Sequence, residues 1–166
     1  FEADVTRAYD KFDTLSTLEL KEFDKVCYME LYHGPTCAFK DFALSVLPCE
    51  IRAAKRNLGA EGEYAILTAT SGDTGKAALE GFKNAEHVRI GVLFPDGGVS
   101  DIQRKQMVTT TGDNVQVWGV RGNFDDCQTG VKNIFGDEAY AEKLLSEHNV
   151  TLSSANSINW GRLMPQ

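Results

Sequence analysis

From residue 61 onward, short apolar runs alternate with amphipathic stretches, and this pattern predicts a repeated strand–helix order. Strands are expected over residues 64–70, 88–94, 114–120 and 150–153, because short apolar runs bounded by turn residues are typical of buried strands. Apolar residues at three- to four-residue steps predict helices between them. Such alternation with short connections indicates a parallel sheet with helices on both faces. The expected fold class is therefore α/β, a three-layer αβα arrangement around a mainly parallel four-stranded sheet.

The first 60 residues follow a different pattern. Residues 1–25 are polar and charged, and we expect a loose lead-in with one helical turn. A strand is predicted over 25–32 and a turn at 33–36, where glycine and proline adjoin. A helix should follow, because apolar residues recur at helical spacing at Ala43, Leu47, Ile51, Ala54 and Leu58. Pro48 interrupts this stripe and predicts a kink or a division into two helices.

Three polar residues stand where helices are expected to begin. Ser100 is a candidate N-cap for a helix that continues to about residue 109, and Asp137 for a helix that carries Tyr140. Asn123 follows a glycine and resembles part of an anion-binding turn. The aspartates at 125 and 126 would repel an anion, so capping is the better interpretation.

Composition narrows the function classes. Hydrophobic residues make up 42% of the 166 residues, enough for a packed core, and the net charge of −7 argues against a nucleic-acid partner. No apolar run approaches the roughly 18 residues of a membrane helix, and no secretory leader pattern is visible. The four cysteines form no CxxC pair and the three histidines no metal pattern, so we expect no metal site. A reduced, cytoplasmic protein is the simplest interpretation.

The loop SGDTG, residues 71–75, joins a predicted strand to a predicted helix. In an open α/β sheet, ligands bind beyond the carboxyl ends of the strands. A helix N-terminus offers unpaired N–H groups and partial positive charge there, which suits a carboxylate or phosphate. A plain capping loop, with Asp73 or Thr74 as the N-cap, is the alternative that this motif alone leaves open.

Lys40 lies in the stretch HGPTCAFKDF, residues 33–42. A lysine amine becomes a nucleophile when burial or a neighbouring cation lowers its pKa. The apolar neighbours Cys37, Ala38, Phe39 and Phe42 could supply that burial. From composition alone, a solvated helix lysine paired with Asp41 is the commoner arrangement.

Five motifs that occur in order along the chain favour the chemical role of Lys40 over that of a solvated lysine. They are HGPTCAFKDF (33–42), TATSGDTGKAA (68–78), SDIQRKQM (100–107), GNFDDCQ with IFGD (122–137) and NSINWGRL (156–163). Together they resemble threonine synthase, most closely its long-chain bacterial and fungal form. The resemblance covers nearly the whole chain, with Cys37 standing where the family usually has leucine.

The resemblance implies a pyridoxal phosphate enzyme of the tryptophan-synthase-β fold type. Its reaction converts O-phosphohomoserine and water to threonine and phosphate. The family's cofactor lysine falls on Lys40, and the cofactor would also be contacted by Asp73 and Thr74. The residues expected to bind substrate are Ser71, Gly72, Asp73, Thr74, Gly75 and Asn159. Charge and position make Arg104, Lys105, Asn159 and Arg162 candidates for the substrate phosphate.

The family's glycine- and asparagine-rich loop for the cofactor phosphate has no counterpart in these 166 residues. We therefore expect an internal fragment that binds pyridoxal phosphate weakly or not at all and is inactive alone. Residues 1–60 would be part of the large cofactor domain, 61–160 the small Rossmann-like domain, and 161–166 the return to the large domain.

Two other functions remain open from the sequence. One is another pyridoxal phosphate lyase or dehydratase of the same fold type. The other is a non-catalytic α/β module, in which exposed Phe39, Phe42 and Leu47 would form an apolar patch that drives association.

Overall fold

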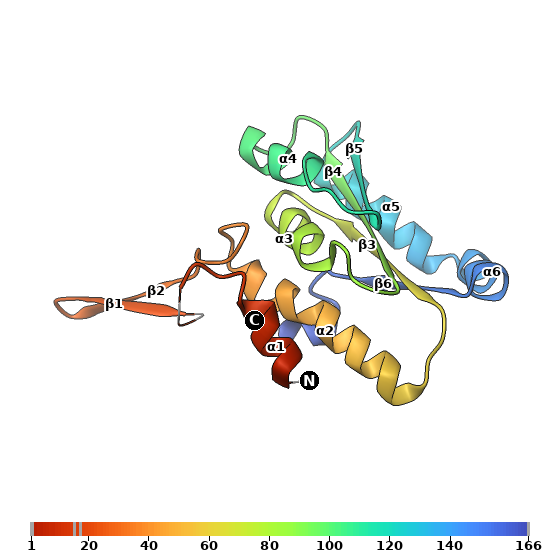
Figure 1. Cartoon of the computed structure of the whole chain (residues 1–166). Coiled ribbons are helices and arrows are strands. Elements are labelled where there is room, and N and C mark those ends of the chain that lie inside the picture. Colours follow the sequence, from red (N-terminus) through yellow and green to blue (C-terminus); the bar gives the residue numbers. More distant parts are fainter. Residues whose placement is uncertain (1, 15, 17, 166) are drawn as a thin grey trace.

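A computed structural model describes residues 2–14, 16 and 18–165, and its centre is a parallel sheet of four strands (Figure 1). The sheet order is β5-β4-β3-β6. Its strands are β3 (Glu63–Ala69), β4 (Val88–Pro95), β5 (Val115–Val120) and β6 (Val150–Ser154). All neighbouring strands in this sheet run parallel, which confirms the predicted fold class.

Helices cover both faces of this sheet. On one face, α3 (Asp73–Phe82) packs on β3 and β4, and α4 (Asp101–Val108) packs on α3. On the other, α5 (Phe124–Gly136) covers β3 and β4, and α6 (Glu138–His148) packs on β6. The larger core cluster lies on the α3 side and includes Phe82, Ile90 and Met107. A smaller cluster between α5 and the sheet contains Ala69 of β3 and Cys127 and Val131 of α5.

The predicted helix starts are confirmed. Ser100 caps α4 in a reciprocal capping box with Gln103, and Asn123 caps α5 in the same way with Asp126. The Asp137 carboxylate accepts from the Tyr140 N–H at the start of α6. In each case a side-chain oxygen satisfies an N–H that the helix itself leaves unpaired.

The helix α2 (Lys40–Leu58) runs unbroken through Pro48, so the expected division into two helices is wrong; a kink stays a prediction. Proline cannot donate to the Leu44 carbonyl one turn earlier. That carbonyl instead faces Gly81 of α3, where an added Cβ would overlap it. Packing of α2 on α3 therefore buries the segment that proline weakens, with Leu44 and Leu47 in the core.

Within the first 25 residues, the described part contains a helix and a strand, which corrects the prediction of a loose lead-in. Helix α1 (Glu2–Tyr9) packs on α2, where Asp4 contacts Arg52 at 2.6 Å and Arg56 at 3.2 Å. The strand β1 (Glu19–Phe23) pairs antiparallel with β2 (Val26–Glu30). Figure 1 shows this hairpin projecting from the body of the molecule.

The expected apolar patch of Phe39, Phe42 and Leu47 does not form. Leu47 is buried, and Phe42 packs edge-on against Phe12, with their ring centroids 5.1 Å apart. Exposed apolar side chains gather instead on the hairpin, at Leu20, Phe23, Val26, Tyr28 and Met29. Within the described residues, no helix is both long and apolar enough to span a bilayer.

Candidate functional site

A cavity of about 660 Å³ lies where the carboxyl ends of β3 and β6 meet α5 and the start of α2. This is the edge of an open parallel sheet at which ligands bind. Its polar lining comes from several elements: Lys40, Thr70, Ser71, Thr74, Gln128, Lys132, Ser154, Asn156, Ser157 and Arg162. Phe124, Val131, Phe135 and Ile158 add apolar walls.

The turn before α2 is shaped by the buried carboxylate of Asp41. Thr36 donates to it twice, from its hydroxyl at 2.6 Å and from its backbone N–H at 2.8 Å. Gly34 is needed at this position, because a Cβ there would lie 2.5 Å from Asp41 Cβ. The Asp41 carboxylate thus faces the HGPT turn. It does not pair with a solvated Lys40, which was the alternative left open by the sequence.

Lys40 begins α2 and lines the cavity. Partial burial lowers the pKa of its amine, and the cations Arg162 and Lys76 lower it further, while Asp73 opposes them. The ammonium lies 4.1 Å from the centroid of the Phe39 ring. A lowered pKa shifts the amine toward its neutral form, which is the nucleophilic one.

The SGDTG loop is held by a residue that precedes it. The Thr70 hydroxyl accepts from the N–H groups of Gly72, at 2.9 Å, and Gly75, at 2.8 Å. Gly72 is the N-cap, with a φ of 137° that favours glycine, so neither Asp73 nor Thr74 caps this helix. The N–H groups of Gly72 and Gly75 are therefore already paired with Thr70 and are not available to a ligand. Those of Asp73 and Thr74, in the first turn of α3, have no acceptor within the helix.

Asp73 lies at the centre of a polar group beside Lys40. Its Oδ1 atom accepts from Gln103 Nε2 at 3.0 Å and lies 3.1 Å from Lys76 Nζ. Burial raises the pKa of the Asp73 carboxyl, but Gln103, Lys76 and Lys40 outweigh it and hold the pKa below its usual value. The side chain of Lys76 is itself almost fully buried. Asp73 is therefore an anion placed among cations.

Arg162 lies in α7 (Trp160–Leu163), the short helix that packs on α2. It is 4% exposed and donates from Nη1 to the Ala155 carbonyl at 2.9 Å, while its buried Nε has no partner among the described residues. Arg162 also lines the cavity, and a guanidinium in a cavity wall is suited to an anionic ligand. Of the basic candidates from the sequence, Arg162 lines the cavity, whereas Arg104 and Lys105 are exposed on α4.

The structure brings some of the predicted site residues together at the cavity and leaves others behind it. Lys40, Ser71 and Thr74 line it. Asn159 caps α7 by accepting from Gly161 N–H, and its amide donates to the Ser154 carbonyl at 2.9 Å. Sequence reasoning missed the α5 wall and Asn156. Asn156 follows the last strand in the position where polar residues of such sheets meet ligands, and that position is the signal that could have found it.

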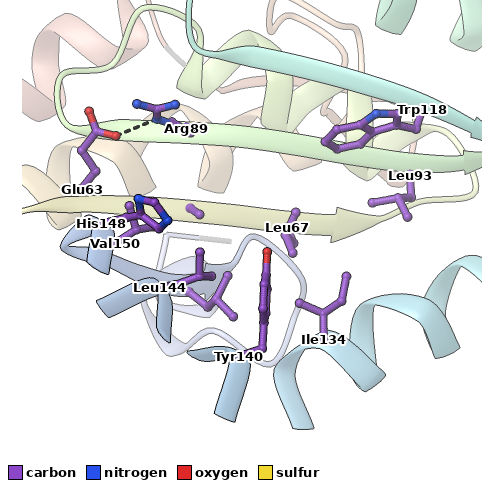
Figure 2. A pocket seen from close by; sticks show the side chains of 12 residues that line it. Glu63, Leu67, Arg89, Leu93, Trp118, Ile134, Tyr140, Leu144, His148 and Val150 are labelled. Carbon is purple, nitrogen blue, oxygen red and sulfur yellow. Dashed lines mark hydrogen bonds and ion pairs between the residues drawn. The ribbon is translucent and has the colours of Figure 1, made fainter. Parts of the chain in front are cut away.

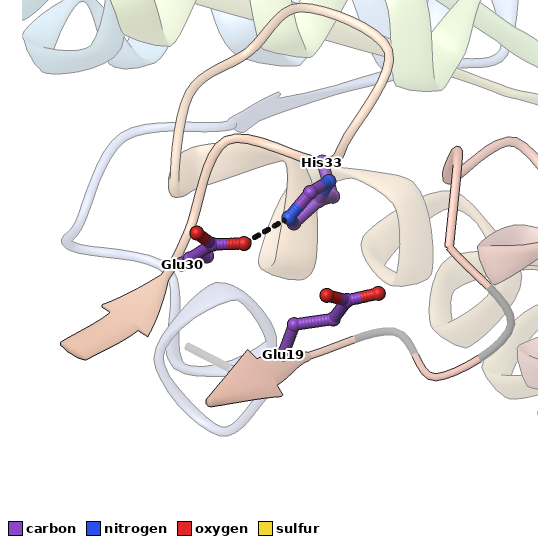
Figure 3. Close-up of side chains that lie close together, drawn as sticks. All are labelled: Glu19, Glu30 and His33. Carbon is purple, nitrogen blue, oxygen red and sulfur yellow. Dashed lines mark hydrogen bonds and ion pairs between the residues drawn. The ribbon is translucent and has the colours of Figure 1, made fainter. Parts of the chain in front are cut away.

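One further cluster could hold a cation. Among the described residues, ligand atoms of Glu19, Glu30 and His33 lie within 4.8 Å of one another at the base of the hairpin (Figure 3). Both ring nitrogens of His33 already contact carboxylates, Asp13 at 2.7 Å and Glu30 at 2.8 Å. A metal would have to displace one of them, so the cluster is better described as an ion-pair network joining the hairpin to the turn.

Comparison with known proteins identifies the constellation. The chain is 45% identical over 139 residues to threonine synthase from Pseudomonas aeruginosa, which covers 83% of this chain and 28% of that protein. The chain belongs to the threonine synthase family. The Schizosaccharomyces pombe threonine synthase is 42% identical over 170 residues, covering 98% of this chain and 32% of its own length. No family model matches the chain.

A solved structure supports the same family assignment. The structure of pyridoxal-phosphate-bound threonine synthase from Brucella melitensis superposes with a TM-score of 0.87 at 40% identity. That match covers 99% of this chain and 34% of the other. The chain spans between 19% and 33% of the length of the curated relatives it matches.

Proposed function

We propose that this chain carries the catalytic lysine of a pyridoxal-phosphate-dependent threonine synthase. The reaction is the conversion of O-phosphohomoserine and water to threonine and phosphate. The observation that supports it most directly is Lys40, an amine of lowered pKa that lines a cavity together with a buried, incompletely paired Arg162.

The donors in the cavity fit the cofactor and the substrate. Lys40 would hold the cofactor's aldehyde carbon, and the cofactor, when bound, withdraws electrons from the substrate. The hydroxyls of Ser71 and Thr74 and the first-turn N–H groups of α3 would bind the substrate carboxylate. Arg162 would bind the phosphate ester, which a dehydratase substrate lacks.

Proton transfer falls to Lys40 in this proposal. Its lowered pKa favours the neutral amine, which would accept a substrate proton and later return one. The bond from carbon to the phosphate oxygen breaks and phosphate leaves. The proton that Lys40 removes from one substrate carbon is returned to another, so threonine gains the hydroxyl of water, and the remaining proton of water leaves with the phosphate. Asp73 would stay ionised beside Lys40 and balance its charge when it is protonated.

We also propose a domain division. Residues 1–60 would belong to the large domain and residues 61–160 to the small domain, and residues 161–166 would return to the large domain. The close packing of α2 on α3 and of α7 on α2 supports a site built across that division. The cytoplasmic location stays part of the proposal, since Cys27, Cys37, Cys49 and Cys127 are free thiols.

A chimera tests the function. The matching segment of the Pseudomonas aeruginosa enzyme is replaced by this chain, and phosphate release from O-phosphohomoserine is measured. Activity is expected in the chimera and should be lost in its Lys40→Ala variant. Preference for serine or threonine as substrate, with ammonia release, would instead assign the chain to a dehydratase.

The 166-residue chain alone is expected to release no phosphate, because its sequence has no glycine- and asparagine-rich loop for the cofactor phosphate. Its lysine should still be selectively reactive. Pyridoxal phosphate followed by borohydride should label Lys40 ahead of exposed lysines such as Lys25 and Lys105. Labelling in proportion to exposure would contradict the role of Lys40.

A further inference from the structure

A second cavity, of about 630 Å³, lies on the α5–α6 face of the sheet and shares no residue with the cavity at Lys40 (Figure 2). Its walls are mostly apolar and come from all four strands of the sheet and both helices. They include Leu67, Leu93, Trp118, Ile134, Tyr140 and Leu144. Figure 2 shows the Tyr140 ring and the side chain of Leu144 reaching from the helices toward the strands.

The short side chain of Ala65 in β3 accounts for the hollow. Successive side chains along a strand point to opposite faces of the sheet, so Ala65 and Leu67 of β3 lie on the same face. Gly91 of β4 is paired with Leu67 and therefore lies on this face too. The rings of Trp118 and the tip of Leu67 already occupy the space above Gly91, where a Cβ would lie 2.6 Å from the indole. Between these groups and α6, the short side chain of Ala65 leaves room for a ligand.

One end of the cavity is charged with both signs. Arg89 Nε donates to Glu63 Oε2 at 2.6 Å, and His148 lies beside them at the end of α6, away from Trp118 (Figure 2). Arg89 and Glu63 keep 71% and 38% of their side-chain surface exposed. Both therefore retain free hydrogen-bonding capacity toward a ligand that enters at this end.

We propose that this cavity binds a small apolar α-amino acid. Arg89 would donate to the carboxylate and Glu63 would accept from the ammonium group, so the ligand inserts into the existing ion pair. The aliphatic or aromatic side chain would extend over Ala65 toward Trp118 and Tyr140. A fatty acid would meet Glu63 with no compensating charge, and a phosphate would find a single arginine that Glu63 already neutralises.

The inference does not depend on the proposed reaction. The cavity at Lys40 lies at the carboxyl ends of the strands, whereas Glu63, Arg89 and Val150 belong to their amino-terminal halves. Failure of leucine to bind would not affect the assignment of Lys40, and inactivity of the chimera would not affect the proposal of an amino-acid site in this cavity.

Trp118 provides the readout. The chain contains two tryptophans, and Trp160 is 79% exposed in α7, so a Trp160→Phe background isolates the signal from the cavity. Titration of this protein with L-leucine should give a saturable change in Trp118 fluorescence. Glycine, which has no side chain, should give none, and added salt should weaken binding because the charged end is exposed.

The ligand's two charges are tested separately. Leucinamide lacks the carboxylate and 4-methylpentanoate lacks the ammonium group. Each should bind at least about fivefold more weakly than leucine, as expected for loss of one partly exposed charge contact. Equal binding of either compound would overturn the proposal, as would the absence of any saturable signal with leucine.

Variants locate the site. Arg89→Gln and Glu63→Gln should each weaken leucine binding about fivefold, and Ala65→Leu should block it by filling the hollow. The matched control is Arg121→Gln, which removes an exposed arginine that lines neither cavity. Normal affinity in both charge variants would place leucine elsewhere and overturn the proposal. Circular dichroism of each variant confirms that the fold is retained.

Discussion

The Thr36 hydroxyl donates to the buried Asp41 carboxylate at 2.6 Å, and this contact fixes the turn that delivers Lys40 to the cavity. The Thr36 and Ala38 N–H groups donate to the same carboxylate, at 2.8 and 3.4 Å. Asp41 thus organises the turn from within the helix that follows it. Its sequence position beside Lys40 suggests an ion pair, but burial gives it a different set of partners.

Asp41→Ala should lower the free energy of unfolding by about 2 to 4 kcal/mol, because it leaves buried donors of Thr36 unsatisfied. Urea denaturation measures the loss. The control Asp113→Ala removes an exposed carboxylate and should change stability by less than about 0.5 kcal/mol. Equal losses in the two variants would show that the turn does not depend on this carboxylate.

Gly81→Ala should destabilise the fold by about 1 to 3 kcal/mol, because the new methyl group overlaps the Leu44 carbonyl and forces α3 away from α2. Gly130→Ala is the matched control, since Gly130 is also inside a helix and a Cβ there meets open space. It should stabilise the protein by about 0.5 to 1 kcal/mol through helix propensity. Thermal unfolding of both variants tests the contrast, and destabilisation by both would contradict it.

The hairpin should be held to the body in a pH-dependent way by His33. Hydrogen bonds to Glu30 and Asp13 raise the pKa of His33 above its ordinary value of 6.5, although partial desolvation opposes them. The stabilisation is therefore fully present below pH 6.5 and is lost as pH rises through the higher pKa of the folded state. At the acid end it is lost as Glu30, whose pKa is lowered by His33 and Tyr32, becomes protonated.

Hydrogen exchange of the β1–β2 amides should consequently show greater protection near pH 6 than near pH 9, after correction for intrinsic exchange. His33→Gln should remove most of that difference. A pH dependence that persists in the variant would assign the effect to another titrating group.

Much of the α/β part of the fold could be predicted because each element carries its own local signal. The strand at 64–70 is a short apolar run, and Ser100, Asn123 and Asp137 have side chains suited to capping. Helix α1 and strand β1 carry no such pattern. The strand β1 has mostly exposed residues and owes its order to pairing with β2. Helix α1 depends on contacts distant in sequence, among them those of Asp4 with arginines more than 40 positions away and of the Tyr9 hydroxyl with the Phe42 carbonyl.

Only part of the site could be predicted from local sequence signals. Lys40, Ser71 and Thr74 belong to contiguous motifs, and the structure places all three in one cavity. The role of Thr70 depends on backbone geometry, because its hydroxyl lies within reach of Gly75 only after the loop closes. The burial of Arg162 depends on α7 folding onto α2. Neither relationship has a spacing that a sequence pattern reveals.

Two substitutions near Lys40 should move its pKa in opposite directions. Asp73 raises that pKa by attraction and Lys76 lowers it by repulsion. Asp73→Asn should therefore lower the pKa of Lys40 further, and Lys76→Met should raise it toward the ordinary lysine value. The rate of reductive methylation at Lys40, followed by mass spectrometry across a pH series, reports the fraction of neutral amine. The midpoint should shift to lower pH in Asp73→Asn and to higher pH in Lys76→Met. Shifts of the same sign would show that the two substitutions act by loosening the loop, because only a direct charge effect requires opposite signs.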